Sequence, residues 1–466
     1  MTVASTRLDG LTALTLTEVA GQIASGALSP IEITDAYLAR IDQVEPQVNA
    51  YVTVCHERAR ADARRAVEER ARGLDRGPLH GVPLGIKDLF DTAGVRTTAG
   101  SGLRRDTVPA RDSAVAARLR AAGSVLLGKH GMHELAWGGT SDNPHFGAVR
   151  NPHDPARIPG GSSGGSAASV VAGTAVASVG TDTCGSVRIP AALSGCVGLK
   201  PTYGRVSMAG AVPLSVSLDH AGPITRTVAD AALLLGVLAG PDPDDPRTLH
   251  EPVPDLLGPL DGEVRGLRIG RLRGWFEQVL DPETGAALDR VAEVLRELGC
   301  QVIDLVAPDP GPVVDLVFRL VAAEAEPVHR DQFATRPEGF GEDLRLHLSR
   351  PAPTSAELAE ARAVLAVTTD WLDAALREVD LLTSATVPAP APQIGEMSLR
   401  LADQELHVEW VLTRLTSIFD VAGLPALSVP CGRSARGLPL GLQVIGRRLD
   451  EVTVLRLGHA YETAGA

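Results

Sequence analysis

The chain has 466 residues, with 44 Lys and Arg residues against 57 Asp and Glu residues, which gives a formal net charge of −13. Neutralising the phosphates of a nucleic acid takes a basic surface, and no long block of Lys and Arg residues occurs, so the charge argues against a nucleic-acid partner. With 44% hydrophobic and 22% charged residues, the composition is that of an ordinary globular protein with a substantial core.

Membrane and disulfide classes are also disfavoured by the sequence. The first ten residues, MTVASTRLDG, lack the charged and apolar regions of a secretory signal. The most apolar windows, 167–180 and 231–240, are shorter than the roughly 20 apolar residues that cross a bilayer. The five cysteines are odd in number and form no C-x-x-C pair, which argues against a disulfide framework or a zinc ribbon. We expect a cytoplasmic protein without a membrane partner.

Helix-start signals mark residues 1–75. Thr15 with Glu18, and Ser29 with Glu32, each match the S/T-x-x-E capping box, and Pro30 stands at the first helical position of the second helix. We expect this region to be helical.

Residues 80–235 alternate between apolar runs of strand length, Gly-rich turns and helices. Asp112 is expected to start an Ala-rich helix that Gly123 ends, and the strand SVLLGK follows. The same order of helix, glycine and strand recurs over 286–306. Alternation of this kind predicts an α/β sheet covered by helices.

The rest of the chain completes a single expected domain over 1–466. Residues 240–400 include several Pro-rich stretches, and we interpret this part as a variable lid or pocket wall. Residues 401–466 are expected to return to the core sheet.

Two clusters of Ser and Gly are the most unusual feature of the sequence. The first is IPGGSSGGSAAS at 158–169, and the second is TDTCGSVRIP at 181–190. A helix and a strand separate them, so an α/β unit would bring two hydroxyl groups together. A Walker-type phosphate loop does not fit, because no Lys follows the glycines. A nucleophile elbow matches only Gly161 to Gly165 and leaves the second cluster unexplained.

Longer segments around these clusters resemble the amidase signature family. They are GVPLGIKDLF (81–90), GGTSDNPHFGAVRNPHD (138–154), PGGSSGGSAASVVAG (159–173), GTDTCGSVRIPAALSGCVGLKPTYGRVS (180–207), SLDHAGPITRTVADAALLL (217–235), GLPALSVPCG (423–432) and GLPLGLQVIG (437–446). The resemblance covers most of the chain outside about 240–375. It implies an α/β/α sandwich with a central mixed sheet flanked by helices.

The family's Ser-cisSer-Lys triad falls on Lys87 as base, Ser162 as bridging serine and Ser186 as nucleophile. A serine hydroxyl needs a base that takes its proton, and a solvated lysine is protonated at neutral pH. Lys87 should therefore be buried, because burial disfavours the charged form. The resemblance also implies that the peptide bond before Ser162 is cis, with Gly161 relieving crowding there.

The turn after the second cluster is expected to hold the anionic oxygen of the tetrahedral intermediate. The resemblance implies an oxyanion hole formed by the backbone N–H groups of Thr183, Cys184, Gly185 and Ser186. The usual Asp-Thr-Gly-Gly-Ser of the family reads Asp182-Thr183-Cys184-Gly185-Ser186 here. We expect that the position of Cys184 does not need a positive φ and that its side chain lines the acyl pocket.

Further residues are assigned supporting roles. Ser163, Asp182 and Arg188 are expected to hold the catalytic loops in register. Trp137, Gly138 and Gly139 are candidate substrate contacts, because this segment borders the substrate in relatives. His130 and His133 do not form an H-E-x-x-H motif and are expected to be ordinary helix histidines.

The predicted reaction is hydrolysis of a C–N bond in a small amide, anilide or carbamate through an acyl-enzyme, with no cofactor and no metal. The expected protein is a monomer or homodimer whose only partner is that substrate. The alternative is the A subunit of a tRNA-dependent amidotransferase, which uses the same triad to free ammonia from glutamine inside a heterotrimer. Such subunits commonly read Ser-Leu-Asp-Gln where this chain has Ser217 to His220, and Ala211 to Ser215 looks closer to stand-alone amidases. An inactive scaffold member is the third possibility, and the complete triad argues against it.

Overall fold

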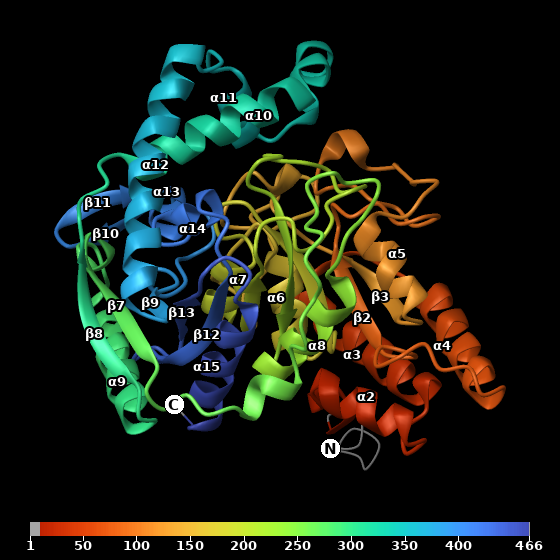
Figure 1. Cartoon of the computed structure of the whole chain (residues 1–466). Coiled ribbons are helices and arrows are strands. Elements are labelled where there is room, and N and C mark those ends of the chain that lie inside the picture. Colours follow the sequence, from red (N-terminus) through yellow and green to blue (C-terminus); the bar gives the residue numbers. More distant parts are fainter. Residues whose placement is uncertain (1–9, 466) are drawn as a thin grey trace.

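A mixed sheet of 11 strands runs through the centre of the protein, as the computed structural model shows for residues 10–465 (Figure 1). The strand order is β1-β3-β2-β4-β6-β5-β12-β13-β9-β7-β8. β2 is parallel to both β3 and β4, and β7 is parallel to both β8 and β9, whereas the strands between these groups pair antiparallel. The prediction of an α/β fold with a central mixed sheet flanked by helices is confirmed.

The strands are β1 (Tyr51–Val54), β2 (Pro83–Lys87), β3 (Val125–His130), β4 (Ala177–Asp182), β5 (Val197–Lys200), β6 (His220–Thr225), β7 (Arg268–Gly274), β8 (Gln301–Ala307), β9 (Leu381–Ala385), β10 (Ser398–Leu401), β11 (Gln404–His407), β12 (Ala426–Arg433) and β13 (Pro439–Ile445). The helices are α2 (Leu16–Ala24), α3 (Pro30–Val48), α4 (His56–Ala71), α5 (Ala114–Ala121), α6 (Gly164–Val171), α7 (Arg188–Ser194), α8 (Val228–Leu238), α9 (Pro282–Glu297), α10 (Val313–Thr335), α11 (Glu342–Leu348), α12 (Ser355–Glu378), α13 (Val408–Thr413), α14 (Ser417–Val421) and α15 (Glu451–Thr463).

The two Ser/Gly clusters lie in short loops next to helices that pack on the middle of the sheet. α6 and α7 contact each other and pack on the central strands, and α8 and α15 form another such pair. α6 begins directly after the first Ser/Gly cluster, and the second cluster connects β4 to α7. The sheet therefore carries both clusters on one α/β unit.

The helix-start signals hold with two corrections. Thr15 and Glu18 form both bonds of a capping box. Ser29 does cap a helix with Pro30 at its start, but its hydroxyl accepts the N–H of Ile31, so the capping box predicted for Ser29 and Glu32 was wrong. The prediction that Asp112 starts the next helix was wrong. Ser113 is the cap, because its hydroxyl accepts the N–H of Ala116. The first ten residues, where a secretory signal was sought, lie almost entirely outside the described residues.

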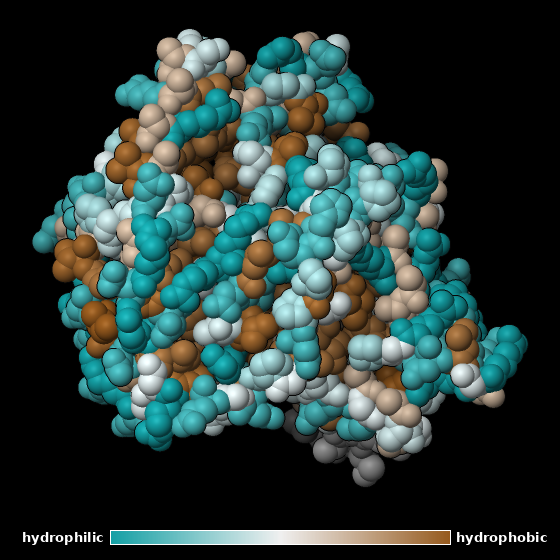
Figure 2. All heavy atoms as spheres, in the orientation of Figure 1, coloured by the Kyte–Doolittle hydropathy of each residue, from teal (hydrophilic) through white to brown (hydrophobic). Residues whose placement is uncertain are grey.

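The region 240–400 contributes both to the sheet and to a group of helices beside it. β7, β8 and β9 extend the sheet to its edge, whereas α10, α11 and α12 stand above it at the top of Figure 1. Figure 2 shows apolar side chains gathered around a hollow among these upper helices. Val328, Leu346 and Val367 are exposed apolar residues of α10, α11 and α12, respectively.

Candidate active site

Two neighbouring parallel strands bring the candidate catalytic residues together. Lys87 is the last residue of β2, and β4 runs beside it with Gly85 opposite Ser178. The loop of Ser162 approaches the loop of Ser186, since the Ser163 N–H donates to the Ser186 carbonyl at 3.3 Å. The expected meeting of the two Ser/Gly clusters therefore occurs at the carboxyl ends of parallel strands, where α/β proteins commonly place their sites.

Lys87 is completely buried, and its amine has two hydroxyl partners. The Nζ atom lies 2.7 Å from the Ser162 Oγ and 2.7 Å from the Thr181 Oγ1. Burial lowers the pKa of Lys87 to about 7, although the carboxylates of Asp219 and Asp182 act in the opposite direction. At neutral pH a substantial fraction of this amine is therefore neutral and able to accept a proton.

The peptide bond between Gly161 and Ser162 is cis. A Cβ atom at Gly161 would lie 2.8 Å from the Gly139 carbonyl carbon and 2.9 Å from the Ser141 nitrogen, so only glycine fits there. The Ser186 hydroxyl makes no hydrogen bond within residues 10–465, and Ser186 is 8% exposed while Ser162 and Lys87 are not exposed. Of the three groups, Ser186 is therefore the one that reaches the surface.

Asp182 organises the loop that ends at Ser186. Its carboxylate accepts the N–H groups of Gly185 (2.6 Å), Val187 (3.2 Å) and Arg188 (3.3 Å). Since the Gly185 N–H is used in this way, the predicted donor at Gly185 is not available for an oxyanion, whereas the N–H groups of Thr183, Cys184 and Ser186 make no hydrogen bond within residues 10–465. Gly185, with φ +122°, takes the positive φ of the turn, and Cys184 does not.

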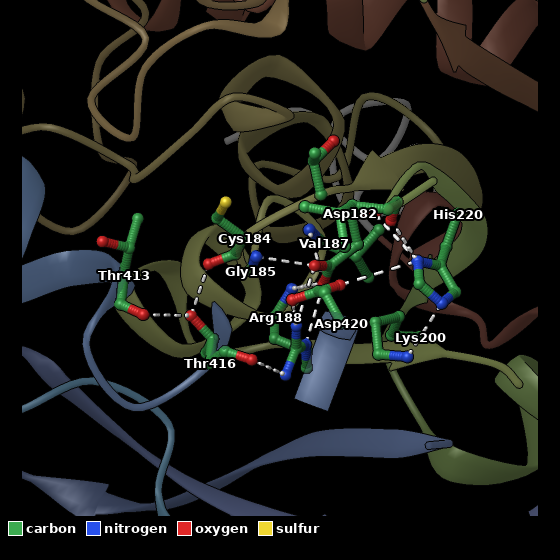
Figure 3. A network of polar contacts seen from close by, with 12 residues as sticks. Asp182, Cys184, Gly185, Val187, Arg188, Lys200, His220, Thr413, Thr416 and Asp420 are labelled. Atoms are coloured by element: carbon green, nitrogen blue, oxygen red, sulfur yellow. Dashed lines mark hydrogen bonds and ion pairs between the residues drawn. The ribbon is translucent and has the colours of Figure 1, made fainter. Parts of the chain in front are cut away.

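Arg188 joins this loop to the C-terminal part of the chain (Figure 3). The buried guanidinium bonds to Asp182 (2.8 Å), to Asp420 (2.6 Å), to Gln443 (2.7 Å) and to the Thr416 carbonyl (3.1 Å). Burial alone would raise the pKa of Asp182, but Arg188 holds it well below its usual range. The expected role of these residues in holding the loops is consistent with this geometry.

Cys184 and Asp219 flank the turn. The Cys184 carbonyl accepts the Thr416 hydroxyl at 2.5 Å, and burial raises the pKa of the Cys184 thiol well above its usual value, so the thiol stays protonated. Asp219 accepts the Thr183 hydroxyl at 2.7 Å, and burial raises its pKa to about 6. Our sequence reasoning assigned no role to Asp219, Asp420 or Thr181. Asp219 and Thr181 both lie inside family-like segments, and this was the signal available for them.

The segment of Trp137, Gly138 and Gly139 lies between the core and the helices above it. The Trp137 ring stacks on His347 of α11 with 5.2 Å between ring centroids, and the Gly139 N–H donates to Glu409 of α13 at 2.7 Å. A Cβ atom at Gly138 would lie 2.3 Å from the His133 ring. Gly139 also lies beside the loop of Ser162, since a Cβ atom at Gly161 would be 2.8 Å from the Gly139 carbonyl carbon.

The assignment of His130 and His133 to a helix was wrong. His130 is the last residue of β3, where its Nδ1 lies 2.8 Å from the Ser178 Oγ, and His133 precedes the short 3₁₀ turn Glu134–Ala136. β3 includes His130 because its pairing with β1 and β2 extends to that residue. No helix of the described part of the chain is both long enough and apolar enough to span a bilayer.

Comparison with known proteins agrees with this architecture. The family model named Amidase matches residues 32–455. The chain belongs to the amidase family. This amidase is therefore an enzyme that acts on carbon–nitrogen bonds.

Three similar proteins bear on its reaction. The amidase is 42% identical to the A subunit of glutamyl-tRNA(Gln) amidotransferase from Roseiflexus sp. (strain RS-1), over 96% of each chain. A solved structure of the corresponding protein from Thermotoga maritima is 32% identical and superposes with a TM-score of 0.82, covering 97% of this chain and 95% of that one. A structure described as a vestigial complex that reveals the origins of an s-triazine catabolic enzyme is 36% identical with a TM-score of 0.91, covering 97% and 99%.

These relatives overturn two expectations. The stand-alone hydrolase of small amides, anilides or carbamates is contradicted, because highly similar relatives along the whole chain belong to amidotransferases. The expectation of a small-molecule partner without nucleic acid is contradicted by the same relatives.

The sequence differences that favoured a stand-alone amidase, at Ser217 to His220 and at Ala211 to Ser215, include residues that pack against the inside of the protein. His220 is buried against Lys200 and the Leu218 carbonyl, and Ser215 bonds to Glu324 of α10. These residues stabilise the loop from the inside, so their identity says little about the substrate. Net charge, in turn, describes one chain and carries no information about what its partners bind.

Proposed function

We propose that this amidase is the A subunit of a tRNA-dependent amidotransferase, in which it releases ammonia from glutamine. The observation that carries the proposal is the 42% identity to the Roseiflexus protein over 96% of both chains. The buried Lys87 beside Ser162 supports the proposal. Release of ammonia from an amide needs an activated nucleophile, and a neutral lysine can serve as the base that activates a serine.

In the proposed reaction, the Ser186 oxygen attacks the side-chain carbonyl carbon of glutamine. Ser162 takes the proton of Ser186 as its own proton passes to Lys87, and the path then reverses to protonate the departing nitrogen. The C–N bond breaks, ammonia leaves and a glutamyl ester remains on Ser186. Water then cleaves the ester and restores the serine. The free Ser186 hydroxyl fits this scheme, because hydrogen bonds of a catalytic group often tighten only once substrate is bound.

The negative oxygen of the tetrahedral intermediate is assigned to the free N–H groups of Cys184 and Ser186. Asp182 and Arg188 hold this turn rigidly, so its donors are in place before the charge develops. Loss of one such donor typically costs about 3 to 4 kcal/mol of transition-state stabilisation. Thr183 supports the turn through its bond to Asp219.

A division of labour among subunits is part of the proposal. Highly similar relatives are A subunits of amidotransferases, so other subunits of such a complex would hold the glutamyl-tRNA. The partners would first activate the side-chain carboxylate of the glutamyl group by transferring a phosphoryl group to it from a nucleoside triphosphate. The ammonia released at Ser186 would then attack this acyl phosphate, with phosphate as the leaving group.

Isotope-labelled glutamine tests this proposal. The purified chain is incubated with ATP, Mg²⁺, glutamyl-tRNA and glutamine labelled at its amide nitrogen, with and without the other subunits of an amidotransferase. We expect partners and tRNA to stimulate ammonia release and the label to appear in glutaminyl-tRNA. Ser186→Ala should remove both signals. Absence of labelled glutaminyl-tRNA with all components present would overturn the proposal.

A further inference from the structure

Thr181 is the second hydroxyl partner of Lys87 and takes no part in the reaction steps above. Its Oγ1 lies 2.7 Å from the lysine Nζ, the same distance as the Ser162 Oγ on the other side. These two hydroxyls are the hydrogen-bond partners of the amine among residues 10–465, and the lysine is fully buried. The orientation of the amine therefore depends on these two contacts.

A neutral amine has two N–H bonds and one lone pair, so its two partners cannot play the same part. To act as a base toward Ser162, the lone pair must face the Ser162 hydroxyl. The N–H bonds must then point elsewhere, and the Thr181 oxygen is an acceptor in a suitable position. A hydroxyl at Thr181 thus distinguishes the productive orientation from the one in which an N–H bond points at Ser162.

The backbone of Thr181 is held by the residue next to the bridging serine. The Ser163 hydroxyl accepts the Thr181 N–H at 3.2 Å and donates to the Thr181 carbonyl at 3.1 Å. This close approach requires glycine at 180, since a Cβ atom there would lie 2.7 Å from the Ser163 Oγ. These two hydrogen bonds of Ser163 therefore hold Thr181 in a fixed position relative to Ser162, the other partner of Lys87.

We propose that Thr181 is a positioning residue that turns the lone pair of Lys87 toward Ser162. Thr181 touches neither substrate nor the attacking oxygen, and it acts only through the lysine. The inference rests on the proposed role of Lys87 as base, so its test must separate the two.

The test measures how fast a serine-directed sulfonyl fluoride labels Ser186, by mass spectrometry of the full chain, from about pH 5 to about pH 10. This readout needs neither glutamine nor any partner protein. Three variants are compared with the wild type. Thr181→Val removes the hydroxyl with little change of shape, and Thr181→Ser keeps it. Thr34→Val is the matched control, because the buried Thr34 hydroxyl has no hydrogen-bond partner in the described part of the chain.

We expect Thr181→Val to lower the plateau labelling rate about 10- to 100-fold, the usual effect of a misplaced catalytic group. The acidic limb of the profile should move to lower pH, because a hydrogen bond accepted from the ammonium form favours that form and is now lost. Thr181→Ser and Thr34→Val should keep most of the wild-type labelling rate, and their rates should fall at the same acidic pH as that of the wild type.

Other results would overturn the inference. General loosening of the site would admit water and move the limb to higher pH, toward ordinary lysine behaviour. Such a shift would exclude a positioning role. So would an unchanged labelling rate in Thr181→Val, or a loss of labelling rate in Thr181→Ser as large as that in Thr181→Val. If Lys87→Met is labelled as fast as the wild type, the proposed base is wrong, whichever result the Thr181 variants give.

Discussion

The loops around Ser186 and the helices α10–α12 are held to the sheet in different ways. Asp182 and Arg188 lie fully buried, and their charged groups use several hydrogen bonds each inside the core. The upper helices pack into the hydrophobic core through buried apolar side chains, among them Leu316 and Leu372, and they make polar contacts with the core at their margin. Glu324 bonds to Ser215 and Ser217, and Asp343 bonds to His133.

This difference separates a site held by buried charges from a group of helices whose polar contacts with the core are partly exposed. Charges buried in the core cannot be rearranged without leaving another charge unpaired. Contacts at a margin are exchanged with water at little cost. We therefore expect changes in the core to alter stability and chemistry together, and changes at the margin to alter the opening of α10–α12 alone.

The largest expected effect is that of Ser186→Ala. Removal of the nucleophile should lower glutamine hydrolysis at least ~10³-fold. The thermal midpoint should stay close to that of the wild type, because the lost hydroxyl makes no hydrogen bond within the described residues. Ammonia release and a thermal melt measure the two quantities. Retained turnover in this variant would remove Ser186 from the mechanism.

Arg188→Met should cause the largest loss of stability. It leaves the Asp182 and Asp420 carboxylates buried without their cation, which typically costs about 3 to 5 kcal/mol of unfolding free energy. Urea denaturation followed by circular dichroism measures the change. Arg330→Met, at an exposed ion pair with Glu326 on α10, is the control and should leave the midpoint unchanged. Equal behaviour of the two variants would contradict the contrast between core and margin.

The pH dependence should follow Lys87. Since the neutral amine is the active form, kcat/KM should fall about tenfold per pH unit below about 7, the pKa that burial gives this lysine, and should be flat above it. Asp219→Asn removes a negative charge that favours the ammonium form, so its limb should lie at lower pH. A limb at the ordinary pKa of lysine would show that the amine is solvated.

The same shift affects stability. The unfolded chain keeps an ordinary lysine pKa of about 10.4, so between about 7 and about 10.4 it binds a proton that the folded chain does not. The contribution of Lys87 to the free energy of unfolding therefore increases as the pH rises through this window. Lys87→Met should remove that contribution in denaturation measured across the same range.

The smallest effect is expected for Glu324→Ala. The change removes the carboxylate that Ser215 and Ser217 bind, and should cost about 1 kcal/mol. Hydrogen exchange should become faster in α10–α12 while β4 keeps its protection. Glu326→Ala on the same helix is the matched control, because its carboxylate pairs with Arg330 of its own helix. Faster exchange in β4 would show that the two regions open together.

Local signals in the sequence were enough to predict much of the fold. The Thr15 capping box and the strand SVLLGK depend on neighbours a few residues away, and both are present. The error at Asp112 arose because two adjacent residues are both good caps, and only the path of the chain selects Ser113. His133 was misplaced for a similar reason, since the end of β3 is set by its pairing with β1 and β2.

The sequence by itself determined the α/β fold class, several of the helices and strands and the two Ser/Gly clusters, because these features depend on residue types at short spacing. Its resemblance to the amidase signature family supplied the three candidate residues of the triad. Only the tertiary structure decided that Thr181 faces Lys87 and that Arg188 joins Asp182 to Asp420. These pairs are far apart in the chain, and their contacts exist because the sheet brings β2, β4 and the C-terminal helices to one place.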